Sequence, residues 1–249
     1  MGRTLATERL EMRPNVLTIA GFDPSGGAGI LADIKTFEQL NCLGMAVQTA
    51  NTVQTENRFQ SVNWVDKNLI KKQLNFLLEQ YQFEFVKVGI IQDLELLEDI
   101  MAHPALSDAK FIWDPVLSSS AGFDFQLNLN NLSTVLSRVF MITPNVDEMK
   151  VLETILPKGE ISSHTNLLLK GGHADRLGVD ILVDLQGDVH EFHPNEVEVG
   201  SIHGSGCILS SAIVACLACG NDLKTAIEKA KRYTEDRLKN NQGLLAYHS

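Results

Sequence analysis

The chain has 249 residues, of which 44% are apolar, so it can bury the core of an α/β domain without disulfide support. Its 31 acidic residues outnumber its 21 basic ones, and the net charge of −10 excludes the basic surface that nucleic-acid-binding proteins need. The four cysteines are irregularly spaced, which excludes a disulfide framework and favours a reducing cytoplasm. No apolar run reaches membrane-spanning length, and the charged residues 1–14 predict a flexible N-terminal arm.

Short apolar strands alternate with helical patterns along the chain. The first strand is predicted at 16–20, and apolar residues three and four apart predict a helix from Ile30 to Leu40. Strands are then predicted at 45–53, 85–91, 110–113, 139–143 and 167–169, with helices at 67–80 and 94–101. Residues 179–184 and 189–192 predict a hairpin, and helices at 207–219 and 223–238 follow it.

This alternation predicts a mostly parallel central sheet with helices on both faces, because parallel strands need a crossover that is usually a helix. No linker or repeat interrupts the pattern, so we expect a single domain over residues 15–249. In such sheets the ligand lies beyond the carboxyl ends of the strands. Polar residues stand at these predicted ends: Asp23, Gln54, Lys87, Asp114, Asn145 and Lys170.

A glycine-rich loop at 21–29 joins the first strand to the first helix, and it would let the backbone approach a ligand closely. The loop lacks the lysine of a P-loop. Gly27, Gly29 and Ala32 match a dinucleotide-binding pattern, but the next strand does not end in the required acidic residue. Two interpretations stay open: a tight turn that packs the helix on the sheet, and a substrate loop in which Asp23 supplies a fixed carboxylate.

A second glycine motif, His203-Gly204-Ser205-Gly206-Cys207, precedes an apolar helix. Glycines at a helix start direct several backbone N–H groups to one point, and the helix dipole adds to their attraction for an anion. The same dipole predicts a lowered pKa for the Cys207 thiol, which would make it a proton acceptor. The alternative is an ordinary glycine-rich N-cap with a buried cysteine.

Carboxylates and one lysine follow three further strands. Asp114 and Glu148 are placed where a hard cation that bridges phosphates would need oxygen ligands. An acidic residue after a strand is also an ordinary helix N-cap, and both interpretations stay open. Lys170 precedes Gly171 and Gly172 at a strand end, where a lone lysine is usually a solvated charge and gains weight only from the other motifs.

These motifs, in this order over residues 15–240, resemble the hydroxymethylpyrimidine/phosphomethylpyrimidine kinases, in the pyrimidine and pyridoxal kinase branch of the ribokinase-like superfamily. The resemblance implies a ribokinase-like three-layer sandwich that forms one kinase domain. The segments that carry it are 18–37, Thr49-Ala50 with Gln54, Lys87-Val88-Gly89, Asp114-Pro115-Val116, Thr143-Pro144-Asn145 with Glu148, Lys170-Gly171-Gly172-His173 and the Cys207 motif.

The resemblance implies ATP-dependent phosphorylation of the hydroxymethyl group of 4-amino-5-hydroxymethyl-2-methylpyrimidine in thiamin biosynthesis, with ATP and Mg²⁺ as cofactors. It further implies that Cys207 is the base and that Gly204, Ser205 and Gly206 form the anion hole. The substrate would contact Gly21, Asp23, Ala28, Gln54, Ile90 and Val116. ATP would contact Lys170, Asn145 and Gly172, and Asp114 and Glu148 would organise Mg²⁺. Action on the monophosphate, pyridoxal as the substrate, and ligand binding without catalysis stay open.

Two segments depart from the family pattern. Residues 117–122 read Leu-Ser-Ser-Ser-Ala-Gly, and the usual glycine-rich C-terminal tail is absent, which weakens the case for the second phosphorylation. The apolar residues Phe123, Phe125 and Leu127 are expected to be exposed, as a lid or a dimer contact. We expect a cytoplasmic homodimer that binds a small pyrimidine and ATP, and neither nucleic acid nor membrane.

Overall fold

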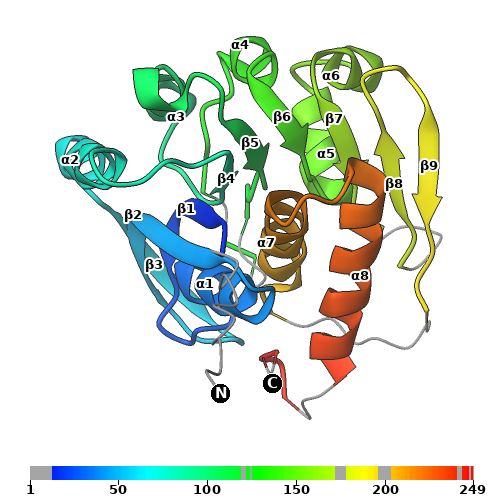
Figure 1. Ribbon diagram of the computed structural model, residues 1–249, viewed down its shortest axis with the longest axis horizontal. Coiled ribbons are helices and arrows are strands. Elements are labelled where there is room, and N and C mark those ends of the chain that lie inside the picture. Colours follow the sequence, from blue (N-terminus) through cyan, green and yellow to red (C-terminus); the bar gives the residue numbers. More distant parts are fainter. Residues whose placement is uncertain are drawn as a thin grey trace, which may run out of the picture.

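The computed structural model describes residues 13–118, 122–123, 125–171, 178–195, 203–239, 243–246 and 248. Every strand in these ranges belongs to one nine-stranded sheet of order β3-β2-β1-β4-β5-β6-β7-β8-β9 (Figure 1). The strands are β1 Asn15–Phe22, β2 Leu43–Gln54, β3 Phe59–Trp64, β4 Phe85–Val88, β5 Lys110–Trp113, β6 Val139–Ile142, β7 Asn166–Leu169, β8 Asp180–Val183 and β9 Val189–Phe192.

The six strands from β2 to β7 in this order run parallel, which confirms the predicted parallel sheet. The predicted hairpin is also confirmed, since β8 pairs antiparallel with β9. The sequence analysis missed β3, which pairs antiparallel with the end of β2 at the sheet edge. This strand is half-exposed and reads FQSVNW, so it lacks the apolar run that marks a buried strand.

Helices cover both faces of the sheet. The helices α2 to α6 contribute to the core on one face, and α1, α7 and α8 contribute to the core on the other (Figure 1). The helices are α1 Gly29–Gln39, α2 Lys67–Leu78, α3 Leu94–Met101, α4 Leu132–Leu136, α5 Val146–Glu153, α6 Lys158–His164, α7 Ser205–Ala218 and α8 Leu223–Lys239, with a 3₁₀ turn η1 at Pro104–Leu106. Helices α4, α5 and α6 were not predicted. The first and last of these span only five and seven residues, and α5 buries two apolar residues where α3, of equal length, buries five.

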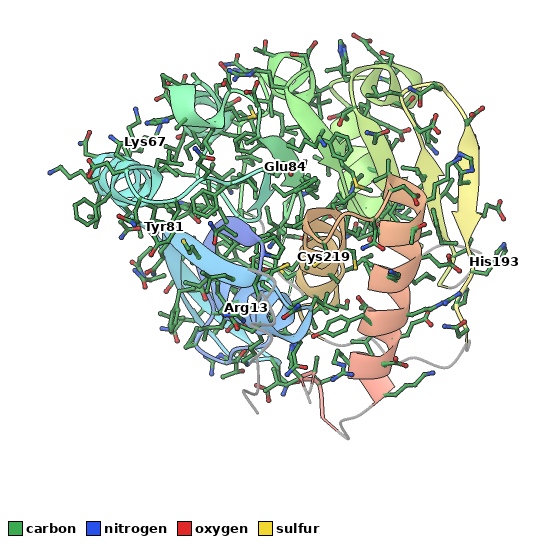
Figure 2. All side chains as sticks on the ribbon, viewed as in Figure 1. Arg13, Lys67, Tyr81, Glu84, His193 and Cys219 are labelled. Carbon is green, nitrogen blue, oxygen red and sulfur yellow. The ribbon has the colours of Figure 1, made fainter. Side chains whose placement is uncertain are left out.

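Local sequence explains where the long helices begin. Asp66 and Asp93 cap α2 and α3, because each carboxylate accepts hydrogen bonds from backbone N–H groups of the first turn. Most of α7 is buried and apolar all round, as expected for a helix that packs between the sheet, α1 and α8. Cys219 ends this helix and is exposed (Figure 2), whereas Cys42 and Cys216 are buried.

The expectation that Phe123, Phe125 and Leu127 are exposed is wrong, because all three are half-buried. The ring of Phe59 on β3 stacks on Phe123 with 4.5 Å between the centroids, and Phe125 meets both rings edge-on. The missed strand β3 therefore covers Phe123 and Phe125, whereas Leu127 packs against the core.

The predicted arm at 1–14 lies outside the described residues except for its last two, and Arg13 forms an ion pair with Glu38 of α1. Among the helices that the structure describes, none combines the length and apolar character needed to cross a membrane.

Candidate active site

A pocket of about 370 Å³ lies at the carboxyl ends of the parallel strands. The polar residues predicted at the strand ends all line it, as expected for a sheet of this class. So do all the predicted site residues that the structure describes: Gly21, Asp23, Ala28, Gln54, Ile90, Asp114, Val116, Asn145, Glu148, Lys170, Gly204, Ser205, Gly206 and Cys207. Gly172 lies outside the described residues.

The two glycine loops pack directly on each other. A Cβ on Gly204 would lie 1.8 Å from the carbonyl oxygen of Gly27, and Gly204 has a φ of +79°, so only glycine fits there. Beside this contact, Nε2 of His203 lies 2.8 Å from Oδ2 of Asp23, and both side chains are buried. Segments at opposite ends of the chain thus form one wall of the pocket.

Asp23 organises the first loop. Its carboxylate accepts hydrogen bonds from the N–H and hydroxyl of Ser25, the N–H of Ala28 and the His203 ring. Burial alone would raise the pKa of Asp23, but the hydrogen bonds from His203 and Ser25 hold it below its usual value. The tight-turn interpretation therefore accounts for this carboxylate, and contact between Asp23 and a substrate stays a prediction.

The start of α7 forms the predicted anion-binding geometry. Gly204 is the N-cap, no side chain caps the helix, and the hydrogen bond from Ile208 N–H to Gly204 O is 3.0 Å long. The N–H groups of Ser205, Gly206 and Cys207 precede this bond, in the first turn where helical N–H groups have no partner within the helix. These groups line the pocket, where the dipole favours an anion.

A lysine and two carboxylates face the same point from three other strand ends. Nζ of Lys170 lies 2.7 Å from Oδ1 of Asp114 and 3.8 Å from Oε2 of Glu148. A Cβ on Gly206 would lie 3.1 Å from this ammonium, which places the cation beside the helix start. Lys170 is thus a buried, paired cation of the pocket and not a solvated charge.

The pKa values of the two carboxylates in this cluster shift in opposite directions. Lys170 and Lys87 outweigh the burial of Asp114 and hold its pKa below the usual value. Burial raises the pKa of Glu148 to about 7, since the opposing charge of Lys170 does not compensate for it. The positive charge of Lys170 therefore does not compensate for the burial of Glu148 as it does, together with Lys87, for that of Asp114.

Asn145 and Glu148 also form a capping box at the start of α5. The Asn145 side chain accepts from the N–H groups of Asp147 and Glu148, and Glu148 Oε2 accepts from Asn145 N–H at 2.7 Å. The N-cap of α5 is therefore Asn145, and Glu148 completes the cap from the third helical position, so the helix-cap interpretation holds for this segment in that form. No described helix begins at Asp114. The cap does not exclude a ligand role for Asn145 and Glu148, because both residues line the pocket.

The donor set fits Mg²⁺. Carboxylate oxygens are ligands that Mg²⁺ prefers, and Asp114 and Glu148 present two of these groups at one pocket wall. Burial raises the pKa of Glu148, and a divalent cation beside it would favour the carboxylate form.

The predicted direction of the Cys207 pKa shift is wrong. Burial raises the pKa of this thiol to about 11, and the nearby Lys87 ammonium opposes the shift without cancelling it. The helix dipole favours the thiolate, but the desolvation of Cys207, which is partly exposed in the pocket, outweighs it. At neutral pH the thiol is therefore the main form.

The sequence analysis assigned no site role to Lys87, whose ammonium is buried in the pocket wall. Its Nζ lies 2.9 Å from Oδ2 of Asp33, and both side chains are fully buried. Asp33 also accepts from the hydroxyls of Thr18 and Ser211, so the pair joins β1, β4, α1 and α7. The available signal was a lysine inside the otherwise apolar strand FVKV.

The model of the phosphomethylpyrimidine kinase family matches residues 23–249. The chain belongs to this family. It is 33% identical over 245 residues to the hydroxymethylpyrimidine/phosphomethylpyrimidine kinase of Aquifex aeolicus, a match that covers 92% of this chain and 95% of that protein.

Two solved kinase structures superpose on most of this chain. Phosphomethylpyrimidine kinase from Clostridium difficile 630 superposes with a TM-score of 0.73 at 31% identity, covering 91% of this chain and 100% of that one. Pyridoxal kinase from Staphylococcus aureus, in complex with AMP-PCP and pyridoxal, superposes with a TM-score of 0.80 at 26% identity, covering 95% and 93%. The fold is thus the ribokinase-like sandwich that the sequence predicts.

Proposed function

We propose that this member of the phosphomethylpyrimidine kinase family transfers the γ-phosphoryl group of ATP to the hydroxymethyl group of 4-amino-5-hydroxymethyl-2-methylpyrimidine. The observation that carries the proposal is the placing of Cys207, the N–H groups at the start of α7 and the Lys170 ammonium in one pocket. Phosphoryl transfer needs mainly positioning and stabilisation of charge, and these groups supply both.

In the proposed reaction, the hydroxymethyl oxygen attacks the γ-phosphorus and its proton passes to the sulfur of Cys207. The bond from the γ-phosphorus to the β–γ bridging oxygen breaks, and ADP leaves with that electron pair. The N–H groups at the start of α7 and the ammonium of Lys170 stabilise the negative charge on the transferred group. Because the thiol pKa is about 11, only the minor thiolate form accepts the proton directly.

ATP and Mg²⁺ complete the site. Asp114 and Glu148 would hold the cation or its waters, and the cation neutralises phosphate charge when bound. Lys170 lies where it would contact the phosphates, next to the α7 N–H groups. Asn145 has its side-chain oxygen engaged in the capping box, so a contact with ATP would use its amide nitrogen.

Pyridoxal is the second candidate substrate, and the Staphylococcus aureus kinase structure supports it. Both compounds are flat nitrogen heterocycles that carry a hydroxymethyl arm. The deciding experiment measures kcat/KM for each with magnesium and ATP, since discrimination between substrates is a difference in transition-state binding. We expect the pyrimidine to have the higher value, and a higher value for pyridoxal would overturn the assignment.

The proposed enzyme is a cytoplasmic homodimer. Its four free cysteines suit a reducing compartment. Light scattering after size-exclusion chromatography tests the dimer, because a monomer has a mass of 27.5 kDa. A peak at the monomer mass under assay conditions would contradict it.

A further inference from the structure

A buried ion pair joins α8 to β8 on the side of the sheet that also carries α7 (Figure 1). Nζ of Lys231 lies 2.7 Å from Oδ2 of Asp180, and less than a tenth of either side chain is exposed. Lys231 also donates to the carbonyl oxygen of Gly178. Apolar residues would fill this space at a lower desolvation cost, so the charges call for an explanation beyond packing.

Both partners of the pair hold the backbone near Gly171. Oδ1 of Asp180 accepts the Gly171 N–H at 2.9 Å, and the Gly171 carbonyl accepts the Gly178 N–H at 3.2 Å. A Cβ on Gly171 would lie 1.7 Å from the Val179 carbonyl oxygen, so only glycine fits where these two backbone segments meet. The hydrogen bonds of Gly171 are thus fixed by groups outside the pocket.

Gly171 directly follows the pocket lysine. The N–H of Lys170 donates to the Pro144 carbonyl at 2.9 Å, which fixes the backbone on its other side. From this position the Lys170 ammonium reaches Asp114. A continuous series of contacts therefore leads from Lys231 through Asp180 and Gly171 to Lys170, and each link is a hydrogen bond, an ion pair or a peptide bond.

We infer that Lys231 and Asp180 are positioning residues for the nucleotide, which hold the backbone of Gly171 so that Lys170 is directed at the phosphates of ATP. This inference rests on the proposed function, because it takes Lys170 as a phosphate contact. It adds two residues that lie outside the pocket and carry no motif of their own. A misplaced phosphate contact weakens the binding of the nucleotide without changing the pyrimidine subsite.

The test uses the full chain and two ligands. Calorimetric titrations measure the Kd of magnesium–ADP and of hydroxymethylpyrimidine for the wild type and the Lys231→Met variant. We expect the Kd of ADP to rise by about fivefold or more and the Kd of the pyrimidine to stay within about twofold. Lys224→Met removes an exposed charge from the same helix and should change neither constant.

A second variant separates an effect on nucleotide binding from a loss of folding. Lys231→Met alone leaves Asp180 buried and unpaired, and it removes the cation that lies 3.9 Å from the buried carboxylate of Glu235. Lys231→Met combined with Asp180→Asn and Glu235→Gln removes all three charges and keeps a side-chain oxygen for the Gly171 N–H. This triple variant should fold and still bind ADP more weakly than the wild type. Equal ADP affinity in the variants, or a parallel loss for both ligands, would overturn the inference. A wild type that binds no ADP would overturn the proposed function and, with it, this inference.

Discussion

The Nε2 atom of His203 lies 2.8 Å from Oδ2 of Asp23, although the two residues are 180 positions apart in the chain. The contact fastens the loop after β1 to the start of α7, where Gly204 and Gly27 meet backbone to backbone. The N–H groups proposed to hold the phosphoryl group are therefore placed partly by a carboxylate on another loop. The loop at 21–29 and the start of α7 are thus held together by side-chain and backbone contacts.

This pairing predicts strong coupling between the two residues. Asp23→Ala leaves the Ala28 N–H, the Ser25 groups and the His203 ring without their buried acceptor, so we expect it to lower the free energy of unfolding by about 2–4 kcal/mol. A double-mutant cycle with His203→Ala, followed by urea denaturation, should give a coupling energy of about 1–3 kcal/mol. Additive effects of the two substitutions would contradict the pairing.

The pKa of the Cys207 thiol should set the pH dependence of kcat/KM. If the thiolate is the base and its pKa is about 11, its population rises roughly tenfold per pH unit up to that value. We expect kcat/KM to rise with the same slope between about pH 7 and 9. The Cys207→Asp variant supplies a base that is already ionised, so its profile should be flat there. The same slope in both enzymes would remove Cys207 from the proton transfer.

The Lys87–Asp33 ion pair should stabilise the packing of α1 and α7 on the sheet. Lys87→Met leaves the fully buried Asp33 without its cation and should cost about 3–5 kcal/mol in the free energy of unfolding. Lys87→Met combined with Asp33→Asn removes both charges, and we expect it to recover much of this loss in urea denaturation. A double variant as unstable as the single one would show that the unpaired carboxylate is not the cause.

The raised pKa of Glu148 should make the free energy of unfolding depend on pH. Its pKa rises from 4.5 to about 7 on folding, so between these values the folded state binds more protons than the unfolded state. The contribution of Glu148 is therefore greatest below pH 4.5 and is lost as the pH rises through 7. Relative to Glu148→Gln, the free energy of unfolding of the wild type should fall by about 3 kcal/mol over this range without magnesium.

Chemical denaturation at several pH values checks this expectation, with the Gln variant measured in parallel. The difference between the proteins isolates Glu148 from the other titrating groups of an acidic chain. A difference that stays constant from pH 4.5 to 7, or that grows with pH, would contradict an elevated pKa.

Most of the residues that line the pocket could be predicted from the sequence, for a physical reason. Side chains at the carboxyl ends of parallel strands meet at one edge of the sheet, so Asp114, Asn145 and Lys170 could be placed together without any knowledge of distances. The glycines of the Cys207 motif likewise predict an anion site, because the start of a helix exposes its N–H groups whatever packs around it.

What the sequence could not provide depends on packing between distant segments. The shift of the Cys207 pKa is decided by burial against the sheet, which outweighs the local helix dipole. The distant partner of Asp23 is His203, just before α7, and the partner of Lys87 is Asp33 of α1, and no spacing along the chain relates them. The edge strand β3 was missed because a half-exposed strand carries too little apolar pattern.

The most direct test of the proposed kinase is to detect its product. Incubation of the full chain with magnesium, ATP and hydroxymethylpyrimidine should yield ADP and an equal amount of hydroxymethylpyrimidine monophosphate, measured by mass spectrometry. The Cys207→Ala variant should still bind the pyrimidine while product formation falls by about a hundredfold or more. No phosphorylated pyrimidine above the background without enzyme would contradict the account.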